Sequence, residues 1–107
     1  VAAMGEAFGV STAWHGPPDC SPFGHAANIH VDLAVPNFGV QEIGGFSDAL
    51  REVFPHSPEI REGYAYVSDR PGLGVDFDEA AAAKHPFQPY DTNWTEARLP
   101  DGSLHRP

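Results

Sequence analysis

Residues 12–42 read TAWHGPPDCSPFGHAANIHVDLAVPNFGVQE, and this stretch contains the pattern that decides the fold. The short apolar run Val10–His15 predicts a buried strand that ends on a histidine. The pair Ser21-Pro22 is typical of a helix start. Asn37–Glu42 predicts a second short strand. The order strand, helix, strand indicates two parallel strands joined by a helical crossover.

The predicted crossover helix runs from Ser21-Pro22 to Pro36, which cannot continue a helix. The residues expected to share its buried face recur at helical spacing. They are Ala26, Ile29, His30 and Leu33.

Two further helical segments flank this unit. Val1–Phe8 reads as the last turns of a helix, with Gly9 just past its end. Phe46–Val53 predicts one or two helical turns. Two parallel strands alone enclose no core, because parallel sheets need covered faces and several neighbouring strands. The first half is therefore expected to be the end of something larger, and Val1 in place of methionine agrees with a missing N-terminal part.

The second half has a different character. Glu59–Ser68 alternates around Glu62-Gly63 and predicts a hairpin. Asp78 is expected to cap a short helix over Glu79–Lys84. From Phe87 to the end, turn residues dominate and predict an extended tail. We therefore divide the chain into 1–58, the strands and helices, and 59–107, the hairpin, short helix and tail.

Composition excludes several classes of protein. The chain has 107 residues and a formal charge of −9, which disfavours binding to nucleic acid. We see neither a membrane span nor a signal peptide, and the single cysteine, Cys20, allows no internal disulfide. A cytoplasmic protein is expected. Trp14 and Trp94 are interpreted as packing residues.

Three polar residues are candidates for a site. The carboxyl ends of parallel strands carry functional side chains, and His15 and Glu42 lie at those ends while Asp19 follows the first strand. Carboxylates and an imidazole on one rim could bind a polyhydroxylated substrate. The alternative is equally open: His15 caps a turn, Asp19 serves the helix start and Glu42 is solvated.

Other motifs predict less. His25 and His30 are five residues apart and do not form a zinc pair on a helix. Cys20 is interpreted as a small buried thiol. Residues 76–79 lack the pattern of a calcium loop, and residues 71–74 lack that of a phosphate loop.

The segments TAWHGPPDCSPFGHAANIHVDLAVPNFGVQE, VFPH, PGLGVDFDEAAAAKHPF and RLPDG together resemble the C-terminal part of the enolase superfamily. The resemblance is closest to its mannonate dehydratase-like group of acid-sugar dehydratases. It implies an α/β fold, the C-terminal portion of a TIM-type (β/α) barrel behind an N-terminal capping domain. This chain would supply the last two strand–helix units and a segment that packs back on the barrel and cap.

The resemblance also implies a function. The family removes water from a sugar acid, with a base that takes the α-proton and Mg²⁺ that stabilises the resulting negative charge. Carried over by position, the substrate contacts fall on His15, Asp19 and Glu42. His15 is also a candidate catalytic base, ranked after substrate contact. The Mg²⁺ ligands are expected upstream, so this chain alone should bind no metal and be inactive.

Some expectations stay open. The family tails end with aromatic residues after the Asp-Gly turn, whereas residues 103–107 here read SLHRP. The divergent tail therefore leaves the sugar acid open within the mannonate or gluconate class. The full-length protein is expected to be a homo-oligomer. The alternatives are another enolase-superfamily reaction, racemisation or cycloisomerisation, and a non-catalytic binding or regulatory module.

Overall fold

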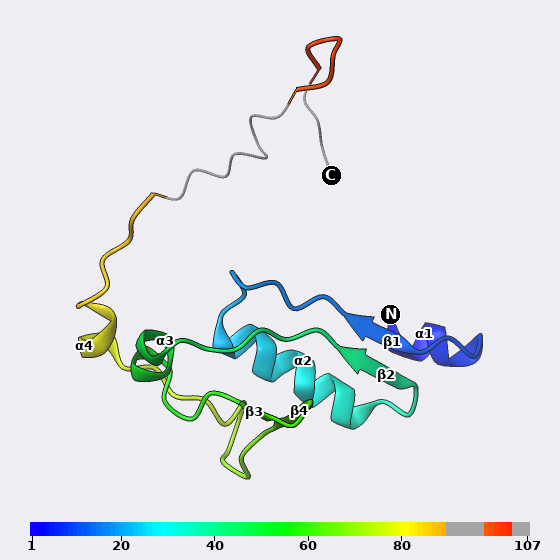
Figure 1. Ribbon diagram of the computed structural model, residues 1–107. Helices are drawn as coiled ribbons and strands as arrows, with labels where there is room; N and C mark the ends of the chain where they lie inside the picture. The colour runs from blue at the N-terminus through cyan, green and yellow to red at the C-terminus, as the bar shows by residue number, and fades with distance from the viewer. Residues whose placement is uncertain (90–97, 104–107) are drawn as a thin grey trace.

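The computed structural model describes residues 1–89 and 98–103 (Figure 1). Within these ranges helices alternate with short strands over most of the chain. The elements are α1 (Ala2–Ala7), β1 (Thr12–Trp14), α2 (Pro22–Ala34), β2 (Phe38–Gln41), α3 (Asp48–Val53), β3 (Glu59–Arg61), β4 (Tyr64–Tyr66) and α4 (Glu79–Ala82). The predicted strands are thus present at the expected places but shorter than the apolar runs that predicted them.

Strands β1 and β2 are parallel and adjacent, as the order of elements predicts. Thr12 pairs with Phe38 and Ala13 with Val40, so the register shifts by one residue between the two pairs. Gly39 lies at this irregularity, where a Cβ atom would stand 2.7 Å from the Thr12 carbonyl oxygen. A glycine therefore allows the two backbones to approach closely at this point.

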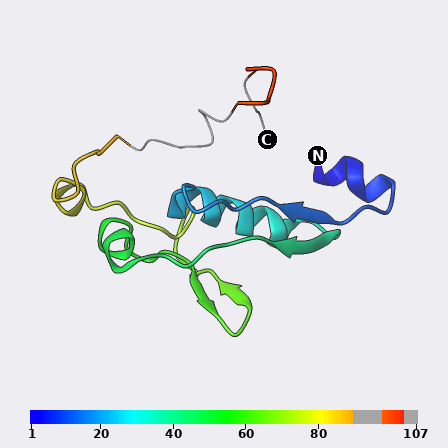
Figure 2. The ribbon, with the colours of Figure 1, turned by 45° about the horizontal axis from the view of Figure 1, so that its top comes forward.

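Helix α2 packs alongside these strands (Figures 1 and 2). The Ser21 hydroxyl accepts a hydrogen bond from the Gly24 N–H at 3.3 Å, which confirms the predicted helix start. The buried residues of α2 are Pro22, His25, Ala26, Ile29 and Asp32.

The predicted buried face of α2 was partly wrong. Leu33 is 70% exposed and His30 is half-buried, whereas Asp32 is buried. The prediction placed residues 26, 29, 30 and 33 on one face by helical spacing and left out His25 and Asp32. The face that α2 turns to the strands is set by the crossing of the helix over β1 and β2, and it includes His25 and Asp32.

Helix α1 is held to the start of β2 by one side chain. Asn37 Nδ2 donates to the carbonyl oxygens of Ala2 and Val10 at 3.0 and 2.8 Å. Between them Gly9 has a φ of 67°, the left-handed conformation expected of a residue just past a helix end. The predicted end of the first helix is confirmed.

Local turn chemistry also explains the second half. Glu62 and Gly63 both have positive φ, 51° and 80°, which suits a two-residue hairpin turn between β3 and β4. The Asp78 side chain accepts a hydrogen bond from the Ala81 N–H at 2.9 Å and caps α4. Helix α4 ends at Ala82, two residues before the predicted end.

An aromatic cluster joins the two halves. The rings of Phe23 and Phe54 lie 5.3 Å apart and those of Phe54 and Phe77 lie 5.4 Å apart. After α4 the chain up to residue 89 leads away from the body (Figure 1). The interpretation of Trp94 and the SLHRP ending after residue 103 falls outside the described residues. Among the described residues, no helix combines the length and hydropathy needed to cross a bilayer.

Candidate active site

The carboxyl ends of β1 and β2 lie side by side and carry the candidate site. The hydrogen-bond pattern of the strands continues one step further, since the Glu42 N–H donates to the Trp14 carbonyl oxygen at 3.1 Å. His15 and Glu42 are the residues immediately beyond the two strands. Both are therefore placed on the same edge of the sheet by parallel pairing alone.

The structure brings His15 and Glu42 together. His15 Nε2 lies 3.6 Å from Glu42 Oε2, and the same oxygen accepts a hydrogen bond from the Gly16 N–H at 3.2 Å. We call these three residues the rim. Both side chains are largely exposed, at 78% and 62%. An exposed ion pair of this kind adds little to stability, so the arrangement matters more for what it can bind.

Gly16 is the residue that makes the rim possible. A Cβ atom at this position would overlap the Glu42 carbonyl oxygen and would lie 3.0 Å from the Cε1 atom of His25. Gly16 itself is buried. The close approach of its backbone lets a main-chain N–H reach the Glu42 carboxylate and orient it.

Asp19 is the third predicted residue and stands apart from the other two. It lies in the loop between β1 and α2, is exposed, and makes no hydrogen bond or ion pair with another described residue. Helix α2 is capped by Ser21, so Asp19 does not serve the helix start. Its carboxylate is available in the loop that leads away from the rim.

The alternative roles of the candidate residues, in which Glu42 is merely solvated, agree only in part with the structure. Glu42 is exposed but is not simply solvated, because it is held by Gly16 and faces His15.

Cys20 is half-buried rather than buried, with its Sγ 3.7 Å from the Ser21 carbonyl oxygen. His30 Nε2 lies 3.4 Å from the Leu73 carbonyl oxygen, which gives this histidine a local structural contact.

Behind the strands lies a second group of polar atoms. Both carboxylate oxygens of Asp32, Gln41 Oε1 and Trp14 Nε1 are buried without a hydrogen-bond partner among the described residues. Burial raises the pKa of the Asp32 carboxyl above its usual value, and the Trp14 indole N–H opposes part of this rise without reaching hydrogen-bond geometry. Desolvation disfavours the charged form of a carboxyl group, which is why the pKa rises.

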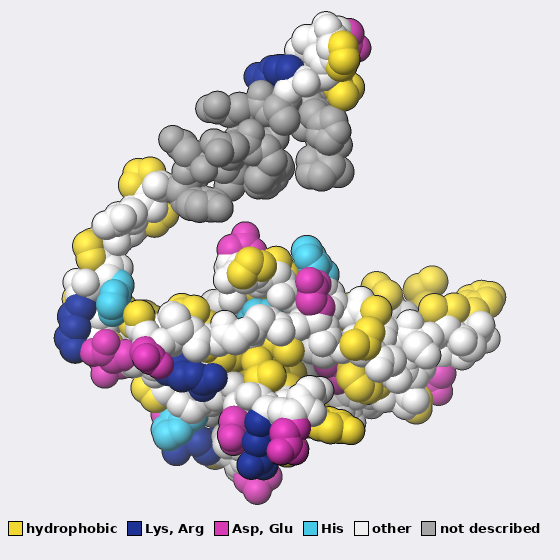
Figure 3. Space-filling model, viewed as in Figure 1, with side chains coloured by type: hydrophobic (Ala, Val, Ile, Leu, Met, Phe, Trp, Pro, Cys, Tyr) yellow, Lys and Arg dark blue, Asp and Glu magenta, His cyan; other side chains and the backbone are white. Residues whose placement is uncertain are grey.

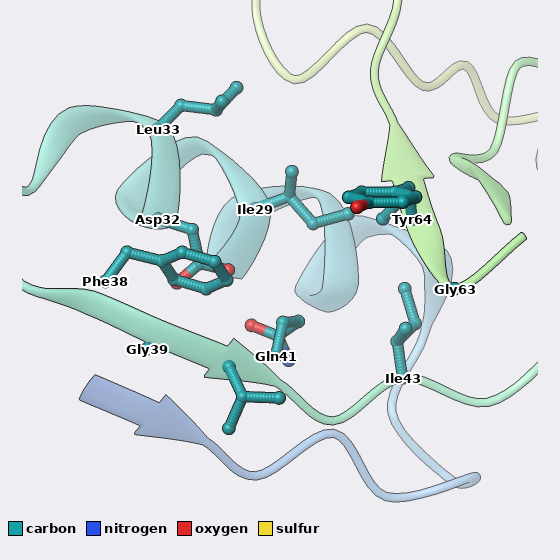
Figure 4. A pocket seen from close by; sticks show the side chains of 11 residues that line it. Ile29, Asp32, Leu33, Phe38, Gly39, Gln41, Ile43, Gly63 and Tyr64 are labelled. Atoms are coloured by element: carbon teal, nitrogen blue, oxygen red, sulfur yellow. The ribbon is translucent and has the colours of Figure 1, made fainter. Parts of the chain in front are cut away.

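Asp32 and Gln41 line a cavity of about 340 Å³ with mostly apolar walls. Figure 4 shows that Ile29 and Leu33 of α2, Phe38 of β2 and Tyr64 of the hairpin surround it. None of the candidate site residues His15, Asp19 and Glu42 lines this cavity. We therefore treat it as a packing surface separate from the rim.

Sequence reasoning missed the role of one buried residue, His25. Its side chain is 1% exposed, and its ring packs edge-on against that of Phe46 with centroids 5.5 Å apart. The sequence offered a signal, because His25 precedes Ile29 by four residues and so lies on the same face of the helix.

The rim can bind hydroxyl groups but does not form a metal centre. Figure 3 shows histidine and acidic side chains close together on the surface of the body. A fixed carboxylate accepts hydrogen bonds from hydroxyls, and the imidazole beside it can donate or accept. Within residues 1–89 and 98–103, no group of three or more His, Cys, Asp or Glu side chains is arranged to hold a metal ion.

Comparison with known proteins places these features in a family. The family model described as Enolase C-terminal domain-like matches residues 1–81. A D-galactonate dehydratase family member from Salmonella virchow is 57% identical over 107 residues, and one from Pantoea ananatis is 56% identical over the same length. In each case the match covers 100% of this chain and 26% of the relative. The chain thus spans about a quarter of the length of these curated relatives.

Solved structures agree with the sequence relatives. The crystal structure of an enolase from Pantoea ananatis with bound D-gluconate and magnesium matches with a TM-score of 0.90 and 57% identity. That match covers 99% of this chain and 26% of the other. A mandelate racemase/muconate lactonizing enzyme from Jannaschia sp. matches with a TM-score of 0.71 and 26% identity, over 84% of this chain and 22% of the other.

Proposed function

The chain belongs to the enolase C-terminal domain-like family, and we propose that it is the C-terminal part of a sugar-acid dehydratase. The fold is the corresponding portion of the TIM-type barrel of the enolase superfamily. The observation that carries the proposal is the rim, where the Gly16 N–H holds the Glu42 carboxylate 3.6 Å from His15. The relatives' family name and the gluconate bound to the Pantoea ananatis enolase support the same substrate class.

In this proposal the three candidate residues contact the substrate. Glu42 accepts hydrogen bonds from sugar hydroxyls, and its orientation is set by the main chain rather than by another side chain. His15 contacts the same region of the sugar, and proton transfer is its second candidate role, ranked after substrate contact. Asp19, free in its loop, adds a further carboxylate acceptor toward a long polyhydroxylated substrate.

The reaction is the elimination of water from a sugar acid to give a 2-keto-3-deoxy acid. A base removes the proton next to the carboxylate, and an acid assists departure of the β-hydroxyl. Magnesium, held by residues elsewhere in the full-length protein, supplies charge stabilisation when bound. The described residues of this chain offer no site for it, so the contribution of this chain is to bind and orient the sugar.

The proposal also covers the organisation of the full-length protein. Residues 1–58 would supply the last two strand–helix units of the barrel. Residues 59–107 would return toward the remainder of the protein. We further propose a cytoplasmic homo-oligomer that acts on a substrate of the mannonate or gluconate class. The bound gluconate of the Pantoea ananatis enolase favours this class without choosing one sugar.

The function is tested with the full-length protein, Mg²⁺ and a panel of hexonates that includes mannonate, gluconate and galactonate. We expect loss of water and formation of a 2-keto-3-deoxy acid from at least one of them. An isomerised or cyclised product that retains all its atoms would contradict dehydration and support the second candidate. That candidate, racemisation or cycloisomerisation, is favoured by the similarity to the mandelate racemase/muconate lactonizing enzyme.

The residue assignment is tested by Glu42→Gln. Glutamine keeps the size of the side chain but removes the charge that the Gly16 N–H and the sugar hydroxyls meet. Hydrogen bonds to charged groups contribute about 1.5–3 kcal/mol, so kcat/KM should fall about 10- to 100-fold without loss of folding. Glu6→Gln, on exposed α1, is the matched control and should leave kcat/KM unchanged. Unchanged turnover in the Glu42→Gln variant would remove this residue from the site.

A further inference from the structure

We propose that His25 is a positioning residue that holds the rim in place from beneath. The inference rests on the proposed function, because it concerns the same site. His25 does not reach the surface, with only 1% of its side chain exposed, so it acts through its neighbours and not by contact with substrate.

The imidazole is carried by a fixed part of the fold. His25 lies in the first turns of α2, and its N–H donates to the Ser21 carbonyl oxygen at 3.1 Å. Ser21 also caps the helix, and Pro22 beside it is fully buried. This end of α2 is therefore firmly anchored, and so is the backbone that carries the imidazole.

His25 also contacts the extensions of both strands. Its Cε1 atom faces Gly16, which follows β1, closely enough that a Cβ there would lie 3.0 Å away. Its ring packs edge-on against Phe46, which follows Glu42 by four residues. One rigid ring thus fixes the distance between the Gly16 peptide and the segment that carries Glu42.

The orientation of the ring also favours a role in the site. Cε1 lies between the two ring nitrogens, so the polar edge of the imidazole is turned toward the rim. Nδ1 is buried and has no hydrogen-bond partner among the described residues. Burying an unpaired nitrogen costs about 1–3 kcal/mol, which an apolar side chain in this place would avoid. A purely structural need is better met by leucine, and the polar ring points to a role in the site.

The test is a double-mutant cycle between His25 and Glu42 in the full-length protein. His25→Ala removes the ring, and His25→Gln keeps most of its reach and a polar end. We expect His25→Ala to lower kcat/KM for the sugar acid about tenfold or more and His25→Gln to restore most of the loss. In a Glu42→Gln background, His25→Ala should have little further effect on kcat/KM, because the carboxylate that it positions is already gone.

His30→Ala is the matched control, since His30 lies on the same helix but is only half-buried. It should keep full activity. Thermal melting separates folding from positioning: if His25→Ala does not fold, the cycle is run with His25→Gln, for which a smaller but non-additive loss is expected. Effects of His25 and Glu42 that simply add, or a folded His25→Ala variant with unchanged kcat/KM, would overturn the inference. Failure of the unmodified protein to act on any hexonate would instead overturn the proposed function.

Discussion

Replacing Gly16 with alanine perturbs the rim at the point where its geometry is tightest. The added Cβ would overlap the Glu42 carbonyl oxygen and press on His25. Gly16 is not among the residues with positive φ, so alanine is not penalised by backbone conformation. The substitution therefore tests the close contacts of Gly16 with the Glu42 peptide and the His25 ring, without a penalty from backbone conformation.

The size of the effect follows from which atom is in the way. The overlapped oxygen belongs to the backbone, so a peptide must move, because no flexible side chain can simply turn aside. Overpacking of this kind costs about 1–3 kcal/mol. Movement of the Gly16 peptide also weakens its hydrogen bond to Glu42 Oε2, now 3.2 Å long. Because Glu42 is exposed, we expect a total destabilisation of about 2 kcal/mol, and a drop in kcat/KM of about tenfold or more.

The assay compares urea unfolding and steady-state kinetics of the full-length variant with those of Gly44→Ala. Gly44 is an ideal control, since a Cβ there meets nothing within 4 Å and its φ is not positive. Gly44→Ala should unfold like the unmodified protein. If the free energy of unfolding of Gly16→Ala were within about 0.5 kcal/mol of this control and the variant were equally active, the bare backbone at Gly16 would not be what orients Glu42.

Two further substitutions test features away from the rim. Burial raises the pKa of Asp32 above 3.8, so the folded state binds this proton more tightly than the unfolded state does. The contribution of Asp32 to the free energy of unfolding should therefore grow as the pH falls through the raised pKa toward 3.8. It should disappear as the pH rises above the raised pKa. Asp32→Asn should abolish this dependence and stabilise the protein at neutral pH by about 1 kcal/mol, measured by urea unfolding; a loss of stability would show that a donor outside this chain pairs with Asp32. Gly63→Ala should cost about 1–2 kcal/mol because its φ is 80°, with Gly45→Ala as the unstrained comparison, and equal unfolding of the two would contradict the left-handed turn.

Elements set by local chemistry could be predicted from the sequence. The cap at Ser21 and the turn at Glu62-Gly63 each depend on a few adjacent residues, and both are present. The pairing of His15 with Glu42 could be predicted in outline, because parallel strands bring their carboxyl ends to one edge. That outline required only the order of the elements.

What could not be predicted depends on how the elements cross. The burial of His25 and the exposure of Leu33 depend on the angle at which α2 lies on the strands, and the spacing of apolar residues along the helix does not fix that angle. The hydrogen bond from Gly16 to Glu42 likewise requires two backbones to approach across 26 residues. A glycine in a loop can serve a turn, a positive φ or a close backbone approach, and the sequence alone does not show which of these applies.

The main-chain origin of the donor that holds Glu42 has a consequence for changing substrate preference. A side-chain donor can be lost by any substitution at its position, but an N–H is present whatever residues surround it. Substitutions in the loop that follows, from Pro17 to Cys20, therefore leave in place the N–H that orients the Glu42 carboxylate. Libraries that vary the other residues of this loop while keeping Gly16 and Asp19 offer a direct route to altered sugar-acid selectivity.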